Sequence, residues 1–265
     1  MSSPSRAVRW RLLDHGEATG PYNMGLDEAL LRRAADEGVA TLRFYTWQGP
    51  WLSLGYAQRR VEAERLAAWQ AAGVGVVRRT TGGRAVLHGN DLTYSIAAPQ
   101  EALRPGLRES YDQVATALLA AIRQLGARDA TRVPVAKGTS EQPAFDCFAA
   151  PAGDEIMIGA EKLVGSAQRR MRGAVLQHGS IRVAADDPDV QLAAGIDADV
   201  SVALHEAGIA PRESELREAL RASFEGVLET RLEPGEVSAT EVAHAQKRVE
   251  LHRLDPLSAP RSRDL

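Results

Sequence analysis

The chain has 265 residues but a single cysteine, Cys147, which excludes an internal disulfide framework and suits a reducing cytoplasm. No apolar run approaches the ~18 residues that a membrane-spanning helix needs. The first ten residues contain arginine but no apolar stretch, so we expect no signal peptide. A net charge of −3 gives no electrostatic reason to expect general nucleic-acid binding.

The composition is otherwise that of an ordinary globular protein. Hydrophobic residues make up 44% of the chain and charged residues 25%, which provides ample apolar material for a core. The length fits one large domain, or a domain with a helical appendage. We find no internal repeat and no low-complexity tract.

Residues 8–14 alternate like a first strand, and an amphipathic helix follows them. Asn23 can cap this helix, which places Asp27 and Glu28 in its first turn, where acidic groups suit the helix dipole. Gly38 is expected to end it.

The remaining pattern predicts further strands and helices in alternation. The expected elements are a hairpin of residues 41–47 and 51–56, helices at 61–72 and 107–125, a hairpin of 155–158 and 162–167, a strand at 175–183, and helices at 213–228 and 239–254.

One stretch, residues 78–95, combines glycine, arginine and histidine between two apolar segments. Gly82 and Gly83 allow backbone N–H groups to approach a ligand without an intervening Cβ. Arg78, Arg79 and Arg84 can pair with phosphate or line a polar mouth. A strand–Gly-Gly–strand pattern is most often a plain turn, but the added arginines and histidine favour a ligand-binding hairpin.

The same stretch resembles the signature loop of the biotin/lipoate protein ligase and lipoyl transferase superfamily, through TGGRAVLH followed by DLTYS. NMGLDEALL and LRFYTWQGPWLSLGYAQ precede it like that family's first helix and first hairpin. EKLVGSAQRR and LQHGSI follow like its lysine strand and the next strand. The resemblance covers about residues 8–185 and implies an α/β fold, a mixed β-sheet flanked by helices, with a C-terminal helical segment.

Cys147 lies between two phenylalanines in a proline-rich segment, where a lone cysteine is ordinarily a small buried hydrophobe. The run CFAAP, followed by KLVGSAQ, resembles instead the branch that transfers octanoyl groups through a cysteine thioester. The ATP-using lipoate ligases of this superfamily do not depend on such a cysteine. Their loop also tends to read GGG, where this chain has Arg84 in third place.

This resemblance implies that octanoate arrives on the phosphopantetheine arm of acyl carrier protein and that the Cys147 thiolate attacks it. Lys162 would lower the pKa of Cys147 and help hold the acyl carbonyl. The acyl group then passes to a lysine of a lipoyl-accepting protein. Cys147 and Lys162 are thus the catalytic residues. The residues expected to bind substrate are Arg79, Thr81, Gly82, Gly83, Arg84, His88, Gly165, Ser166, Ala167 and His178.

His88 and His178 both match family positions, and either a hydrogen-bonding role in the pocket wall or proton transfer is open to each. The acidic residue usual after the first histidine is replaced by Gly89, although Asp91 follows two residues later. No metal-ligand spacing emerges, so no metal is expected.

A basic cluster of Lys162, Arg169, Arg170 and Arg172 has Glu161 as its only acidic sequence neighbour. It is either a solvated strand end or a docking surface for acidic carrier domains.

We therefore expect one catalytic domain over residues 1–265, with a core at about 8–185 and a C-terminal helical segment at about 186–258. The expected function is octanoyl transfer from acyl carrier protein to the glycine-cleavage H protein or a 2-oxoacid dehydrogenase E2 domain, by a cytoplasmic monomer without a bound cofactor. The alternatives are an ATP-dependent lipoate–protein ligase lacking its accessory domain, and a carrier-binding module without turnover.

Overall fold

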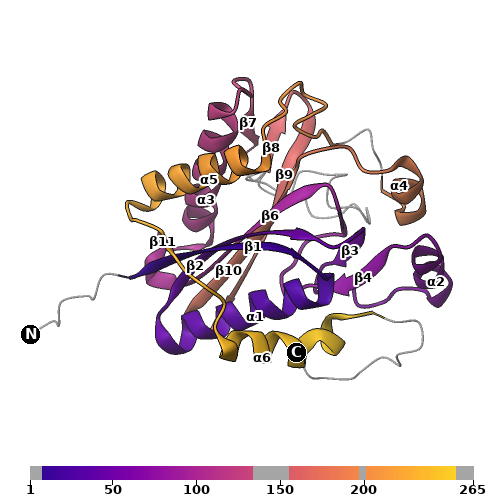
Figure 1. Cartoon of the computed structure of the whole chain (residues 1–265), viewed down its shortest axis with the longest axis horizontal. Coiled ribbons are helices and arrows are strands. Elements are labelled where there is room, and N and C mark those ends of the chain that lie inside the picture. The colour runs from indigo at the N-terminus through magenta and orange to yellow at the C-terminus, as the bar shows by residue number, and fades with distance from the viewer. Residues whose placement is uncertain (1–7, 134–154, 197–200, 255–265) are drawn as a thin grey trace, which may run out of the picture.

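The computed structural model describes residues 8–133, 155–196 and 201–254, in which helices cover both faces of a large β-sheet (Figure 1). The elements in chain order are β1 (Trp10–Ala18), α1 (Gly20–Glu37), β2 (Ala40–Trp47), β3 (Trp51–Leu54), α2 (Ala63–Ala71), β4 (Gly75–Arg78), β5 (Val86–His88), β6 (Asp91–Pro99), the short 3₁₀ helix η1 (Gln100–Ala102), α3 (Leu107–Gln124), β7 (Thr131–Val133), β8 (Glu155–Ile158), β9 (Glu161–Met171), β10 (Ala174–Arg182), α4 (Pro188–Ala194), α5 (Glu213–Leu228), β11 (Glu233–Pro234) and α6 (Ala239–His252).

In the described part of the chain, the large sheet has the strand order β11-β1-β2-β6-β10-β9-β8-β7. β1 pairs in parallel with β2 and β11, and the other neighbouring pairs of this sheet are antiparallel. The prediction of a mixed sheet flanked by helices is therefore confirmed.

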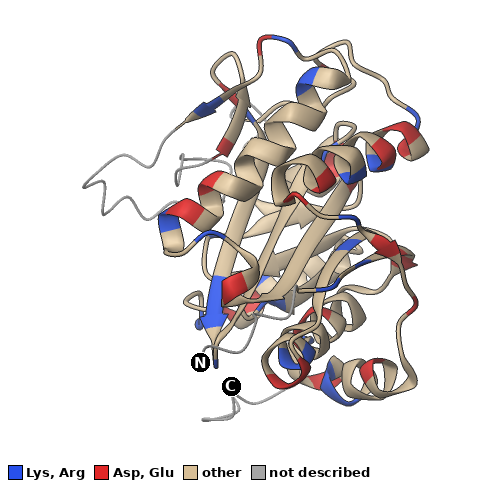
Figure 2. Ribbon diagram, turned by 90° about the vertical axis from the view of Figure 1, so that its left-hand side faces the viewer, with Lys and Arg blue, Asp and Glu red and all other residues tan. Residues whose placement is uncertain are grey.

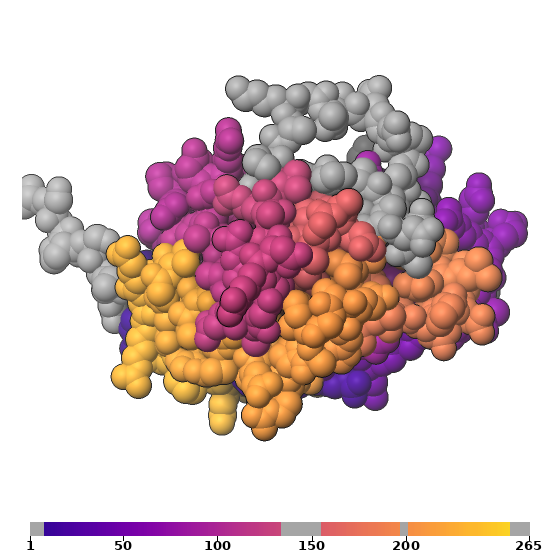
Figure 3. Space-filling model, turned by 90° about the horizontal axis from the view of Figure 1, so that it is seen from above, coloured from indigo at the N-terminus to yellow at the C-terminus, as the bar shows by residue number. Residues whose placement is uncertain are grey.

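The central strands β6 and β10 are buried on both faces, because successive side chains of a strand point to opposite sides. Leu92, Tyr94 and Ile96 of β6 pack with α3 and α5, whereas Ala97 packs with α1 and α6. Figure 3 shows α3 lying against α5 on one face of the molecule. The sheet is thus the middle layer of three.

A second sheet of strand order β4-β3-β5 adjoins the large one. β3 pairs in parallel with β4 and antiparallel with β5. Its apolar residues pack with α2 and α4 around the buried Trp69. This small sheet carries one wall of the site described below.

Two predicted hairpins are wrong. Both edges of β2 are occupied, by β1 and β6, so β3 cannot pair with it and enters the second sheet instead. The ligand-binding hairpin predicted over residues 78–95 is also wrong. β4 and β5 lie on opposite edges of β3, whereas β6 belongs to the large sheet. The two glycines therefore lie in a connection that crosses β3, not in a turn between paired strands.

The first helix begins earlier than predicted, and Asn23 is not its cap. Thr19 holds the N-cap position with Pro21 in the first turn, so Asn23 lies inside the helix. Asp27 and Glu28 consequently lie beyond the first turn, and their interpretation as helix-dipole charges is wrong. Gly38 ends the helix in the left-handed conformation at φ 70°, as predicted.

The other predicted helices and the hairpin of β8 and β9 are confirmed with small changes of boundary, while α4 was not predicted. α5 packs against α3, and α6 packs against α1. β11 adds a strand to the edge of the large sheet beside β1. The C-terminal helices therefore contribute to the same core as the rest of the described chain.

Figure 2 shows acidic and basic positions together on the helices, as in the ion pairs of Arg217 and Arg221 with glutamates of α5. The outer helices thus present mixed charge instead of a surface of one sign. None of the helices within residues 8–133, 155–196 and 201–254 has the length and apolar character needed to cross a membrane.

Two helical glycines allow the packing of α6 on α1 to be tested. A Cβ on Gly25 would lie 2.7 Å from the Ala245 carbonyl oxygen, whereas a Cβ on Gly226 would meet nothing within 4 Å. We expect Gly25→Ala to lower the free energy of unfolding by about 1–3 kcal/mol, because α6 must move away. Gly226→Ala should raise it by about 0.5–1 kcal/mol through helix propensity. Urea unfolding measures both, and equal effects would contradict the close contact.

Candidate active site

A cavity lies where the two sheets meet, with an empty volume of about 370 Å³ that includes its open mouth. Apolar and polar side chains share its wall. The lining residues are Met24, Tyr45, Trp47, Ser53, Arg79, Val86, His88, Thr93, Gly165, Ser166, Ala167, His178, Gly179 and Ser180.

Six of the predicted substrate-binding residues line this cavity, and four lie beside it. Those in the wall are Arg79, His88, Gly165, Ser166, Ala167 and His178. Thr81, Gly82, Gly83 and Arg84 belong to the adjoining segment of residues 79–84, hereafter the glycine loop. Cys147 lies outside the described residues.

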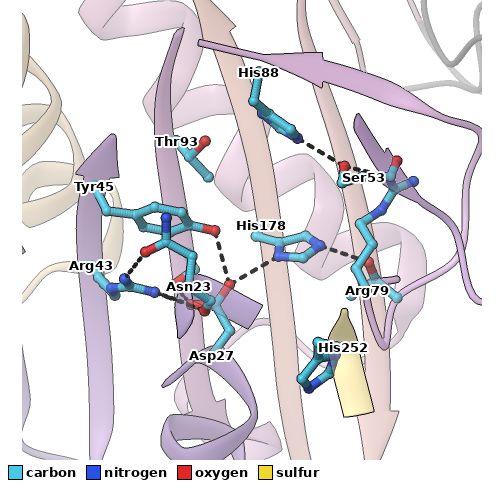
Figure 4. A network of polar contacts seen from close by, with 12 residues as sticks. Asn23, Asp27, Arg43, Tyr45, Ser53, Arg79, His88, Thr93, His178 and His252 are labelled. Carbon is cyan, nitrogen blue, oxygen red and sulfur yellow. Dashed lines mark hydrogen bonds and ion pairs between the residues drawn. The ribbon is translucent and has the colours of Figure 1, made fainter. Parts of the chain in front are cut away.

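Asp27 of α1 is the centre of a buried polar network beside the cavity (Figure 4). Its Oδ1 accepts hydrogen bonds from Arg43 Nη1 and Ser95 Oγ, both at 2.8 Å. Its Oδ2 accepts from Tyr45 Oη and His178 Nδ1, both at 3.1 Å. Burial raises the pKa of Asp27, but the hydrogen bond from His178 and the charge of Arg43 outweigh it and hold that pKa below its usual value. Asp27 is therefore an ionised carboxylate with four donors.

Arg43 supplies the compensating charge and is itself fully buried. Its Nη2 donates to Asn23 Oδ1 at 2.6 Å, and its guanidinium lies 3.8 Å from the centre of the Tyr45 ring. These contacts explain why Asn23 lies inside the helix: its side chain belongs to the network and not to the helix start.

His178 of β10 connects Asp27 to the glycine loop. Because an ionised carboxylate only accepts, His178 Nδ1 carries the hydrogen and the bare Nε2 accepts from Thr81 Oγ1 at 2.6 Å. Burial lowers the pKa of His178 although Asp27 opposes this. The imidazole is therefore neutral, with its lone pair toward the loop (Figure 4).

His88 of β5 makes a second arrangement of the same kind. Its Nδ1 donates to Asp91 Oδ2 at 2.9 Å, and its Nε2 is hydrogen-bonded to Ser53 Oγ at 2.8 Å. Its ring stacks on Trp47 with centroids 3.9 Å apart. Asp91 thus supplies the carboxylate that Gly89 cannot.

The side chain of Arg79, the first residue of the glycine loop, binds other parts of the loop and Ser53 of β3. Its Nη1 donates to the Ser53 carbonyl at 2.6 Å and to Ser53 Oγ at 2.9 Å, and its Nη2 donates to the carbonyls of Gly82 at 2.9 Å and Arg84 at 2.6 Å. Of the two roles predicted for the arginines, lining a polar mouth agrees with the place of Arg79 in the cavity wall.

The glycines of this region are required for different reasons, and one has no such requirement. A Cβ on Gly55 would lie 1.9 Å from the Gly83 carbonyl oxygen, so Gly55 allows β3 to meet the loop. Gly83 has a φ of 89°. Gly82 has neither constraint: it is exposed, and a Cβ there would meet nothing within 4 Å among the described residues. Its backbone is open to an approaching ligand.

Lys162 of β9 is buried, and its Nζ pairs with Glu155 Oε1. Its inclusion in an exposed basic cluster is therefore wrong, because it is buried and pairs with Glu155. Its action on Cys147 stays a prediction.

Two arginines of the same cluster, Arg169 and Arg170, also contact other parts of the protein. Arg169 Nη1 donates to the Thr80 carbonyl at 3.1 Å, and Arg170 Nη2 donates to Ser110 Oγ at 2.7 Å. Both side chains are half-buried. They join β9 to neighbouring elements, and docking of acidic carriers stays a prediction.

Gly165, Ser166 and Ala167 lie at the point where β9 meets β10 under the cavity. Ser166 Oγ lies 2.7 Å from Tyr94 Oη, and burial raises the pKa of Tyr94 to about 12. A Cβ on Gly179 would lie 2.6 Å from the Gly165 carbonyl oxygen. Small residues are therefore required where β9 and β10 pack together in this part of the cavity wall.

The sequence interpretation missed Asp27, Ser53 and Tyr45 as site residues. A signal existed for Asp27, since it lies three residues after Met24 and three before Leu30, on the apolar stripe of its helix. A carboxylate on such a stripe must find buried partners. No comparable signal marks Ser53, whose partner His88 is 35 residues away.

Residues 19–225 match a protein family model described as the lipoyl protein ligase A/B catalytic domain. Octanoyltransferase LipM of Moorella thermoacetica is 44% identical over 187 residues, which are 69% of this chain and 68% of the relative. Octanoyltransferase LipM of Symbiobacterium thermophilum is 37% identical over an alignment of 266 positions, which covers 92% of this chain and 95% of the relative.

Among solved structures, lipoate-protein ligase A bound with ATP superposes with a TM-score of 0.75. The match covers 92% of this chain and 95% of that one at 22% identity. At that identity, the likeness concerns the fold alone.

The protonation states of Asp27 and His178 predict how stability depends on pH. Both pKa values are lowered in the folded chain, so each group contributes stability that is complete above its unfolded pKa and is lost as the pH falls. The His178 contribution is lost below pH 6.5 and that of Asp27 below about pH 4. We expect His178→Gln to reduce the slope of unfolding free energy between pH 7 and 5 by up to about 1.4 kcal/mol per pH unit.

Urea unfolding at several pH values measures this slope. The exposed His205 provides the matched control, because His205→Gln removes a histidine outside the network. Equal slopes for His178→Gln and the parent protein would show that His178 is not held neutral by folding.

Proposed function

Since this chain belongs to the family of lipoyl protein ligase A/B catalytic domains, we propose that it is an octanoyltransferase of lipoate biosynthesis. It moves an octanoyl group from acyl carrier protein to a lysine of a lipoyl-accepting protein. Either the glycine-cleavage H protein or a dehydrogenase E2 domain has the lysine that the reaction needs.

One observation carries this proposal: a relative named octanoyltransferase aligns over 92% of this chain and 95% of its own length at 37% identity. A second octanoyltransferase is 44% identical over about two thirds of each chain. The match therefore extends over the whole architecture and not only over the glycine loop.

The cavity supports the proposal in chemical terms. Met24, Trp47, Val86 and Ala167 provide apolar surface for a medium-length acyl chain. The open backbone at Gly82 adjoins the cavity and can receive the amide-rich phosphopantetheine arm.

In the first half of the proposed reaction, the Cys147 thiolate attacks the thioester carbonyl of the octanoyl carrier. A bond forms between Sγ and the carbonyl carbon, and the bond to the phosphopantetheine sulfur breaks. The carrier leaves as a thiolate, which takes a proton from solvent. The product is octanoyl-Cys147.

In the second half, the neutral ε-amine of the acceptor lysine attacks the same carbonyl carbon. The C–N bond forms, the C–S bond breaks, and the nitrogen loses one proton to solvent as the amide appears. Cys147 returns as a thiolate. Exchange of a thioester for an amide runs downhill, so neither step requires a nucleotide.

Cys147 provides the first test. Incubated with octanoyl–acyl carrier protein and no nucleotide, the protein should gain one octanoyl group that hydroxylamine releases, as measured by intact mass spectrometry. Cys147→Ala should lose both the adduct and the transfer to acceptor, because the chain has no other thiol.

Two further arms of this experiment separate the alternatives. Free lipoate with ATP and magnesium should yield little modified acceptor, and efficient ATP-dependent ligation would identify a lipoate ligase instead. A protein that binds the carrier but forms no adduct would be a binding module. Full transfer by Cys147→Ala would rule out the thioester route.

The ion pair of Lys162 with Glu155 changes how the role of Lys162 is tested. Lys162→Met alone leaves a buried carboxylate without this cation, which is expected to cost about 3–5 kcal/mol of stability. The double variant Lys162→Met/Glu155→Gln removes both charges. If Lys162 activates Cys147, the midpoint of Cys147 alkylation with pH should rise toward ~8.5 in the double variant.

Glu155→Gln alone is the matched comparison, because it leaves the ammonium without the opposing carboxylate. It should move the alkylation midpoint downward, since removing the negative charge of Glu155 leaves a more positive potential that favours the thiolate. Identical midpoints in the parent protein and the double variant would show that Lys162 does not tune the nucleophile.

A further inference from the structure

Glu28 lies next to Asp27 on α1 but faces helix α6 instead of the cavity. Its Oε2 accepts hydrogen bonds from Arg248 Nε at 2.9 Å and His252 Nε2 at 3.2 Å. Burial raises the pKa of Glu28, but the hydrogen bonds from His252 and Arg248 outweigh it and lower that pKa to about 2. Glu28 is thus a second ionised carboxylate on this helix, and the reaction proposed above does not use it.

His252, at the end of α6, joins Glu28 to the base of the glycine loop. Its Nδ1 lies 2.8 Å from the backbone carbonyl oxygen of Arg78. A carbonyl oxygen only accepts, so His252 Nδ1 carries a hydrogen and donates it to Arg78.

The backbone after α6 reinforces this connection. Leu254 N donates to the Val76 carbonyl at 3.0 Å, and Arg253 forms an antiparallel bridge with Val77. The end of α6 therefore extends along β4, directly before the loop. These residues lie outside the segment 19–225 that matches the family model.

Two histidines thus hold the glycine loop, one at Thr81 within it and one at Arg78 directly before it, and each is oriented by one of two successive carboxylates of α1. Asp27 orients His178, which holds Thr81, and Glu28 orients His252, which holds Arg78. In Figure 4, His178 and His252 both lie beside Arg79. A shift of the Arg78 carbonyl would move Arg79 and the backbone of the loop with it.

We propose that His252 is a positioning residue for octanoyl transfer, which sets the glycine loop through the Arg78 carbonyl so that the loop can receive the carrier arm. The kinetic consequence expected of this inference rests on the proposed function. The positioning itself is independent of which acyl group is transferred. The C-terminal helix is then part of the site although it contributes no lining residue.

The two nitrogens of His252 can be separated by substitution. In His252→Asn, the amide nitrogen lies where Nδ1 was and can still donate to Arg78. In His252→Gln, it lies where Nε2 was and donates to Glu28 instead. We expect His252→Gln to raise KM for octanoyl–acyl carrier protein roughly 3- to 10-fold with kcat nearly unchanged, as for the loss of one hydrogen bond that acts in binding. His252→Asn should stay within about 2-fold of the parent KM.

His244 provides the matched control on the same helix. It lies 3.9 Å from Glu28 but does not contact the loop, so His244→Gln should leave KM unchanged. A role of His252 in packing alone would give the Asn and Gln variants the same KM. That result would overturn the inference.

Hydrogen exchange without substrate separates this inference from the proposed function. Amides of residues 79–84 should exchange faster in His252→Gln than in the parent, His252→Asn and His244→Gln proteins. Equal exchange in all four overturns the positioning role, even if octanoyl transfer is confirmed. Absence of transfer by the parent protein, with the exchange difference present, rejects the proposed function only.

If His252→Gln does not fold, a measurement on the parent protein still tests the inference. Nitrogen NMR of the ring should show a hydrogen on Nδ1 of His252. A bare Nδ1 cannot donate to Arg78, and finding one would overturn the proposal.

Discussion

The buried ion pair between Asp27 and Arg43 is the interaction on which the site depends. A lone buried carboxylate would take up a proton or unfold the region, because the desolvation of an unpaired charge costs several kcal/mol. Arg43 compensates that charge, so Asp27 stays ionised while His178 stays neutral. The direction of the His178–Thr81 hydrogen bond follows from this, and with it the attachment of the glycine loop to the central strand β10.

The helix α1 serves the site on two sides because consecutive residues of a helix point about 100° apart. Asp27 turns toward the cavity and Glu28 toward α6, and each orients a histidine that reaches the glycine loop. Arg79 donates hydrogen bonds both to the Gly82 carbonyl and to Ser53, and Ser53 is in turn hydrogen-bonded to His88. The backbone at Gly82 can therefore stay open to a ligand while the residues around it are fixed.

Much of the local structure was predictable from the sequence. The apolar periodicity of residues 107–125, 213–228 and 239–254 identified α3, α5 and α6, and Gly38 marked the end of α1. The order of motifs around Gly82, Lys162 and His178 pointed to the family and to six residues of the cavity wall. The pairing of β3 was not predictable in this way, because it depends on which edges of β2 the distant strands β1 and β6 had already occupied.

The sequence by itself therefore determined the helices other than α4, the fold class and the segments that carry the site, since periodicity and turn chemistry are local properties. Only the tertiary structure decided what those residues do to one another. Asp27 and His178 are 151 positions apart, and Glu28 and His252 are 224 apart. Whether a carboxylate is a solvated helix charge or the buried partner of a histidine depends on burial and on the opposing charge. Both arise only when segments distant in the chain pack together.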